Sequence, residues 1–334
     1  MSEKLKELAR TIVSYSIHVE KNEKVLITTQ SLETRELVSY LIEEIYKSGG
    51  IPYVKFNDPL WGSQLAQGNT DKRIELLKTI QEQEVALYDS FIQIRYGMND
   101  YEEKNVSPEM KRKLSKALLK SSDIRVNERK WVLLNYPSLL DAHKANMTTH
   151  DFTKFALDVM TVNYQNMHQL IEPLKKLMDK TDKVRIVAPG TDLTFSIKGM
   201  KSIPCTGEKN IPDGELYSAP VKTSVNGKIT YNTPSPYLGN VYHHVSLDFK
   251  DGKIIKATCD EDDQKLNEIF DTDEGARYVG EFSLGFNPKI LHPMGDILYD
   301  EKILGSLHFT PGQAYKDCYN GNDSGIPVSY THLR

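Results

Sequence analysis

A change of pattern near residue 183 constrains the fold of this chain most strongly. Before it, strand-like runs alternate with long amphipathic stretches, and after it short strands follow one another through tight turns. Alternating strands and helices are typical of a parallel sheet with helices on its faces, whereas tight turns join antiparallel strands. Because 334 residues also exceed the usual size of a single core, we predict two domains.

The first part of the chain begins with a β-α-β unit. A strand is expected at 24–29, Ser31 is placed to cap a helix, and an apolar stripe at helical spacing runs over 37–45 until Gly49 and Gly50 end it. A second strand is expected at 51–56. Further helices are predicted at 72–83, 108–121, 149–161 and 164–178, and further strands at 91–96 and 131–134. We therefore predict an α/β N-terminal domain with a parallel sheet over residues 1–183.

The second part is predicted to be a mainly β (α+β) catalytic domain over residues 184–325. Strands are expected at 184–187 and 193–197, with hairpin signals at Asn226-Gly227 and Asp251-Gly252. One helix is expected at 262–270, where the acidic run 260–263 suits the positive end of the helix dipole.

Composition and charge exclude several classes of function. A net charge of -4 does not suit a nucleic-acid binder, which needs clustered Lys and Arg, and no phosphate-binding glycine loop follows the first strand. No apolar run is long enough to cross a membrane. Three widely spaced cysteines fit neither a disulfide framework nor a metal knuckle, so we expect a cytoplasmic protein.

Glu215 is the first candidate for chemistry. It directly follows Pro212-Asp213-Gly214, a turn in which proline presets φ and glycine takes a positive φ. A carboxylate leaving such a turn has a fixed direction, although glutamates that follow turns often simply face water.

Glu281, His308 and Tyr315 are the other candidates. Glu281 lies in an apolar, glycine-flanked run, where a carboxylate is costly to bury unless it pairs with Arg277 or binds a cation. His308 has apolar neighbours and is either a ligand or a hydrogen-bonded core residue. Tyr315 either packs or directs its phenol at an oxyanion. The adjacent pair His243-His244 cannot easily bind one metal, because neighbours on a strand point to opposite faces.

Together these segments resemble the M29 family of metal-dependent aminopeptidases. The resemblance rests on five segments, namely 23–27, 185–195, 210–215, 271–281 and 307–309. It implies that Glu215, Glu281 and His308 bind a pair of divalent metal ions, zinc or cobalt, and that Tyr315 is an active-site tyrosine. It further implies a cytoplasmic homodimer that acts on peptides with a free N-terminus.

The chain departs from the family pattern in its last residues. The family carries a final His-x-Asp pair, and Pro327 and Ser329 stand where that pair is expected. Proline has no donor atom, and a serine hydroxyl is a poor zinc ligand. Residues 326–334 carry no helix or strand signal and resemble translated adapter DNA joined to a truncated reading frame, which would make His332 accidental.

The function predicted is that of an aminopeptidase that uses two metal ions and is impaired by the missing pair. Glu215 or Glu281 is the general base, and Tyr315 hydrogen-bonds the oxyanion. The alternatives are a non-catalytic peptide-binding or dimerisation module of the same fold, and a metallohydrolase such as a dipeptidase.

Overall fold

A computed structural model describes residues 1–237, 240–326 and 332–333, which form two compact units. The first unit comprises Met1–Thr161 and Gly207–Pro212, and the second comprises Val162–Thr206 and Asp213–Arg334. The chain therefore leaves the first unit after Thr161, returns for six residues, and leaves again at the turn that precedes Glu215.

The first unit is built on a parallel five-stranded sheet of order β2-β1-β3-β4-β8. Its strands are β1 (Lys24–Thr29), β2 (Ile51–Phe56), β3 (Ser90–Tyr96), β4 (Lys130–Tyr136) and β8 (Asn210–Ile211). The strand β8 comes from the returning segment, so the sheet is completed by residues far along the chain.

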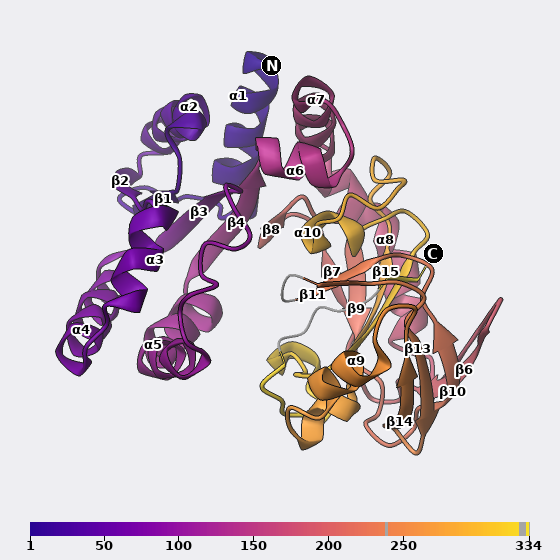
Figure 1. Ribbon diagram of the computed structural model, residues 1–334. Helices are drawn as coiled ribbons and strands as arrows, with labels where there is room; N and C mark the ends of the chain where they lie inside the picture. Colours follow the sequence, from indigo (N-terminus) through magenta and orange to yellow (C-terminus); the bar gives the residue numbers. More distant parts are fainter. Residues whose placement is uncertain (238–239, 327–331, 334) are drawn as a thin grey trace. The chain divides into compact units, whose positions relative to one another are not determined.

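Helices cover both sides of this sheet, with α1 and α2 on one side and α4 and α5 on the other (Figure 1). The helices are α1 (Ser2–Thr11), α2 (Arg35–Lys47), α3 (Pro59–Gln67), α4 (Asp71–Leu87), α5 (Pro108–Glu128), α6 (Leu139–Lys144) and α7 (Thr149–Met160). Two shorter turns are the π-helix η1 (Ile12–Ser16) and the 3-10 helix η2 (Leu32–Thr34), which Ser31 caps by accepting from the Glu33 N–H. The α/β prediction for this part of the chain is confirmed.

The second unit holds two antiparallel five-stranded sheets, of order β14-β13-β10-β6-β5 and β17-β16-β15-β9-β7. Strands of the first are β5 (Lys183–Ala188), β6 (Thr191–Ser196), β10 (Asn226–Thr230), β13 (Ser246–Lys250) and β14 (Lys253–Thr258). Strands of the second are β7 (Ile203–Cys205), β9 (Glu215–Ser218), β15 (Val279–Gly285), β16 (Leu307–Pro311) and β17 (His332–Leu333). The strands β11 (Ser235–Tyr237) and β12 (Asn240–Tyr242) form a separate pair. The prediction of a mainly β part is confirmed.

Few helices accompany these sheets. They are α8 (Tyr164–Met178), α9 (Asp263–Phe270), α10 (Ile297–Asp300) and the 3-10 turns η3 (Glu274–Arg277) and η4 (Lys316–Cys318). Asp262 caps α9 by accepting from the backbone of Gln264 and Lys265, as expected for the acidic run at that helix start.

Both sheets and α8 contribute to the core of the second unit. Apolar side chains of Phe195, Phe249, Phe282 and Phe309 meet there, with ring centroids of Phe195 and Phe309 5.0 Å apart. Ile171 and Met178 of α8 lie in the same core. The boundary expected near residue 183 follows the change of pattern, but the units divide at Thr161 because α8 packs with the strands that follow it.

Two local expectations were wrong. Asn226-Gly227 is not a hairpin turn but the start of β10, where Gly227 has φ +111° and a side chain would strike the Asp192 carbonyl. The last residues carry no strand signal in the sequence, yet His332–Leu333 forms a short strand that pairs with β16. An edge strand such as β16 presents unpaired backbone groups with which another strand can pair. The Asp251-Gly252 signal is confirmed as the turn between β13 and β14.

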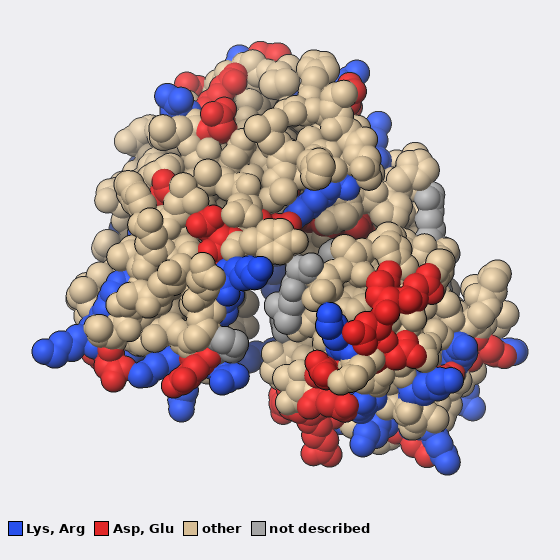
Figure 2. Space-filling view, in the orientation of Figure 1, with Lys and Arg blue, Asp and Glu red and all other residues tan. Residues whose placement is uncertain are grey.

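Basic and acidic side chains are interspersed over the face drawn in Figure 2, in keeping with the small net charge. Within the described ranges, every helix is too short or too polar to cross a membrane.

Candidate metal centre

One face of the sheet β17-β16-β15-β9-β7 carries the candidate site. Along β15 and β16 polar residues alternate with apolar ones, so that Glu281 and Ser283 lie opposite Thr310 and His308 in the register. Since side chains two residues apart on a strand share a face, these groups point the same way. Phe282 and Phe309, on the alternate positions, point into the core. The same sheet thus presents a polar face for chemistry and an apolar face for stability.

The turn before β9 places Glu215 on this polar face. Gly214 has φ +134°, and a Cβ there would lie 2.8 Å from the Asn287 Cβ, so glycine is required on both counts. The Asn287 amide donates to the Asp213 carbonyl at 2.7 Å, which ties the turn to the chain beyond β15. The chain bends at Pro212, after a cis Ile211-Pro212 peptide bond, and this bend is held by a residue far away in sequence.

Glu215 is buried and bound at both carboxylate oxygens. The Ser283 hydroxyl donates to Oε2 at 2.8 Å, and the Lys302 ammonium lies 3.4 Å from Oε1. Only 6% of Glu215 is exposed, so it is not the water-facing glutamate of the alternative interpretation. Its direction is fixed by these side chains as well as by the turn.

Glu281 and His308 form a buried pair. His308 Nε2 lies 3.6 Å from Glu281 Oε2 and 2.6 Å from the Thr310 hydroxyl. Burial raises the pKa of Glu281 although His308 opposes it, and Glu281 raises the pKa of His308 to about 8 against the effect of burial. Arg277 does not pair with Glu281 but with Asp271, at 2.6 Å.

Tyr315 lies beside this cluster. Its ring packs against Tyr217, with centroids 5.2 Å apart, and 45% of the residue is exposed. Burial around its hydroxyl, together with the carboxylates of Glu281 and Glu301, raises the pKa of Tyr315 well above its usual value. The phenol therefore stays protonated and can donate a hydrogen bond.

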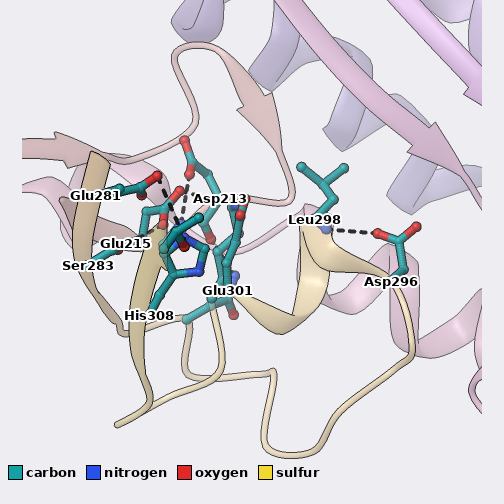
Figure 3. Close-up of polar contacts among 12 residues, drawn as sticks. Asp213, Glu215, Glu281, Ser283, Asp296, Leu298, Glu301 and His308 are labelled. Atoms are coloured by element: carbon teal, nitrogen blue, oxygen red, sulfur yellow. Dashed lines mark hydrogen bonds and ion pairs between the residues drawn. The ribbon is translucent and has the colours of Figure 1, made fainter. Parts of the chain in front are cut away.

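The structure brings together Glu215, Glu281 and His308, which point toward one another in Figure 3. The family resemblance grouped these three residues, and the antiparallel register of three strands brings them together. Their roles as ligands stay predictions.

Cys205 and Asp213 belong to the same cluster and were missed in the sequence. One ligand atom each from Cys205, Asp213 and Glu215 lie within 4.8 Å of one another. Burial and the carboxylates of Asp213 and Glu215 raise the pKa of the Cys205 thiol well above its usual value. The sequence alone does not show this proximity, because it is the pairing of β7 with β9 that puts Cys205 opposite Glu215.

Two further charged residues were also missed. Glu301 and Lys302 follow the short helix α10, and the Lys302 side chain, fully buried, forms an ion pair with Glu301. Burial raises the pKa of Glu301 to about 7, while Lys302 acts in the opposite direction. The preceding Asp300 is buried too, and burial raises its pKa to about 7.

The cluster fits a divalent cation. Asp213, Glu215 and Glu281 are all buried, and within the described part of the chain Lys302 is the one lysine buried with them. A buried excess of carboxylates is costly unless a cation neutralises it, and oxygen, nitrogen and sulfur donors of this kind are ligands of divalent metals.

Other sequence candidates lie elsewhere. His243 and His244 are exposed, and each pairs with its own carboxylate, Glu261 and Asp260 respectively. Pro327 and Ser329, at the positions of the expected His-x-Asp pair, lie outside the described residues. The backbone of His332 lies opposite His308 in the register of β16 and β17.

Comparison with known proteins assigns the family. The model of the thermophilic metalloprotease (M29) family matches residues 1–332. The chain belongs to this family. Its relatives include aminopeptidase AmpS of Bacillus subtilis, 27% identical over 51% of this chain and 46% of AmpS. Aminopeptidase T of Thermus aquaticus is 28% identical over 41% of this chain and 36% of the relative. These matches span less than half the length of each relative.

Solved structures share the fold of this M29 family member. Wild-type AmpT from Thermus thermophilus superposes with a TM-score of 0.80 at 18% identity, over 98% of this chain and 92% of AmpT. The 2,5-dihydroxypyridine dioxygenase of Pseudomonas putida KT2440 superposes with a TM-score of 0.62 at 13% identity, over 100% of this chain and 92% of the dioxygenase. At such identities the likeness establishes the fold alone.

Proposed function

We propose that this chain is a metal-dependent aminopeptidase that releases N-terminal residues from peptides. The observation that carries the proposal is the buried cluster of Glu215, Glu281 and His308 on one sheet face of a metalloprotease-family member. Relatives that share part of the sequence are named aminopeptidases.

In this proposal Glu281 and His308 hold a divalent ion together with Glu215. A bound divalent ion supplies a lowered pKa for a coordinated water and polarises the scissile carbonyl. Glu215, whose carboxylate is oriented by Ser283, accepts the proton from the attacking water, with Glu281 the alternative base. Tyr315, held protonated by its surroundings, donates a hydrogen bond to the oxyanion.

The family resemblance predicts two ions, zinc or cobalt, and the departure from the family pattern at the end of the chain predicts an impaired enzyme. We expect weak metal binding and slow turnover, because Pro327 and Ser329 offer no equivalent of the family's His-x-Asp pair. A homodimer and a cytoplasmic location are further predictions of the resemblance. Light scattering on the purified chain tests the first of these.

Hydrolysis of a peptide series tests the activity. The series pairs each peptide of two to six residues with an N-acetylated copy, and each is incubated with the metal-loaded protein, with and without a chelator. An aminopeptidase cleaves only the peptides with a free amine, at every length. Its activity is lost when the chelator removes the metal ion.

Three results distinguish the alternatives. Cleavage confined to dipeptides indicates a dipeptidase. Chelator-independent peptide binding without any cleavage indicates the non-catalytic module. Cleavage of acetylated peptides at the same rate as the free ones contradicts an exopeptidase that recognises the N-terminus.

A further inference from the structure

Lys302 is an unusual residue to find among these carboxylates. Its side chain is completely buried, and its ammonium lies 3.4 Å from Glu215 Oε1 and in an ion pair with Glu301. A buried ammonium is costly unless it is paired and hydrogen-bonded. Among the described residues, the Lys302 ammonium pairs with two carboxylates of the candidate site, those of Glu215 and Glu301.

The backbone around Lys302 fixes this position. The Lys302 N–H donates to the Tyr299 carbonyl at 3.0 Å, and the Asn287 N–H donates to the Lys302 carbonyl at 3.1 Å. Asn287 also holds the turn that directs Glu215, through its bond to the Asp213 carbonyl. The ammonium and the Glu215 carboxylate are thus oriented by one shared residue, so their contact is a built feature of the fold.

The Lys302 ammonium is paired on two sides, with Glu215 Oε1 at 3.4 Å and with Glu301. The other oxygen of Glu215, Oε2, accepts a hydrogen bond from the Ser283 hydroxyl at 2.8 Å. Part of the negative charge of the cluster is therefore neutralised by the chain itself, which leaves less for divalent ions to neutralise.

We propose that the Lys302 ammonium is an internal cation that occupies one of the two cation positions of this cluster, so that the chain binds one divalent ion fewer than the same cluster with a neutral residue at position 302. We assign the remaining ion to Glu281 and His308, which form a buried pair on the strands β15 and β16. This inference rests on one part of the proposed function, namely that the cluster binds a divalent metal ion, and it does not require peptide hydrolysis.

Counting zinc ions per chain tests the inference. The full chain and its Lys302→Met and Lys302→Asn variants are titrated with zinc chloride at neutral pH, so that weakly held ions are counted as well. The bound zinc is then measured by mass spectrometry and titration calorimetry. The matched control is Lys130→Met, which removes a lysine paired with the buried Glu23 at 3.0 Å in the first unit.

We expect one zinc ion in the unmodified chain and in the Lys130→Met control, and a rise of one ion in each Lys302 variant. Two ions in the unmodified chain, or no rise in the Lys302 variants, would overturn the inference. Circular dichroism of each variant verifies that the sheets are intact.

A measurement on the unmodified chain covers the case in which the variants do not fold. Nitrogen-15 labelling of lysine makes a buried, slowly exchanging ammonium visible by NMR, and Lys302 is the fully buried lysine of the described residues. A slowly exchanging signal that persists at saturating zinc is expected. Its absence, or its loss on zinc addition, overturns the inference. Both readouts are independent of peptide hydrolysis, so a chain that binds one ion but cleaves nothing contradicts the proposed function alone.

Discussion

At the scale of single residues, the orientation of Glu215 depends on a hydroxyl that is not itself a ligand. Ser283, fully buried on β15, donates to Glu215 Oε2 at 2.8 Å. Groups that orient metal ligands typically change metal affinity or activity by about 10- to 100-fold when they are removed. We therefore expect Ser283→Ala to weaken zinc binding by about that factor, as measured by calorimetry.

Ser218→Ala is the matched control for that substitution. Ser218 lies opposite Phe282 on the neighbouring strand β9, is also buried, and its hydroxyl has no hydrogen-bond partner among the described residues. The Ser218→Ala variant should bind zinc with the affinity of the unmodified protein. Equal affinities for the two serine variants would show that the Ser283 hydroxyl does not orient a ligand.

Asp300 should make the stability of the protein depend on pH. Its pKa in the folded protein is about 7, above the ordinary value, because it is buried. The folded state therefore holds the proton more tightly than the unfolded chain, and the stabilisation is complete below the unfolded pKa and is lost as pH rises toward 7. Each unit of raised pKa corresponds to about 1.4 kcal/mol.

Asp300→Asn should remove this dependence, since the amide does not ionise. Urea unfolding with a chelator present, at pH 5 and pH 7.5, should show a smaller loss of stability in the variant than in the unmodified protein. The exposed Glu268→Gln, on α9, should retain the full loss. An undiminished pH dependence in Asp300→Asn would mean that Asp300 is ionised throughout.

At the scale of elements, β16 joins the chemistry to the core through its alternation. His308 and Thr310 face the site, and Phe309 between them packs with Phe195, Phe249 and Phe282. Removing a fully buried phenylalanine costs about 3–5 kcal/mol. We expect this loss for Phe309→Ala in urea unfolding, against a change within about 0.5 kcal/mol for the exposed Ile255→Ala on β14. Similar losses in both would contradict the assigned core.

The elements themselves were largely predictable, because their periodicity is local. The helices α7 and α8 and the Asp251-Gly252 hairpin follow from apolar spacing and turn residues alone. Asn226-Gly227 misled because a hairpin signal carries no information about the strand that approaches it, here β6. The short helix α10 has too few residues to show a period, so the position of Lys302 could not be read from the sequence.

At the scale of the whole molecule, the site is a product of long-range pairing. Local pattern offered Glu215, Glu281 and His308 one by one, and the family resemblance grouped them. The order β16-β15-β9-β7 places them on one face with Cys205. The alternation of polar and apolar residues in β15 and β16 was visible in the sequence and would have indicated a shared face. The partners Asp213 and Lys302 carry no comparable signal, because a turn residue and a lysine usually face water.

The two units also show why the domain boundary was hard to place. The sequence shows where the pattern of secondary structure changes from helices to strands. A compact unit is defined instead by which elements pack against one another. Here α8 reads as a continuation of the α/β part but buries Ile171 and Met178 with the later strands. Residues 207–212 return to the first unit and add the two-residue strand β8 to its sheet, which is too short to give a strand signal in the sequence.

The central claim is that the buried carboxylate cluster of the second unit binds a divalent ion. Crystals grown with zinc, with diffraction recorded on both sides of the zinc absorption edge, test it directly. We predict an anomalous peak about 2.0–2.2 Å from the Glu281 carboxylate and the His308 ring. Zinc found only at exposed sites, such as His243 with Glu261, and none beside Glu281 would contradict it.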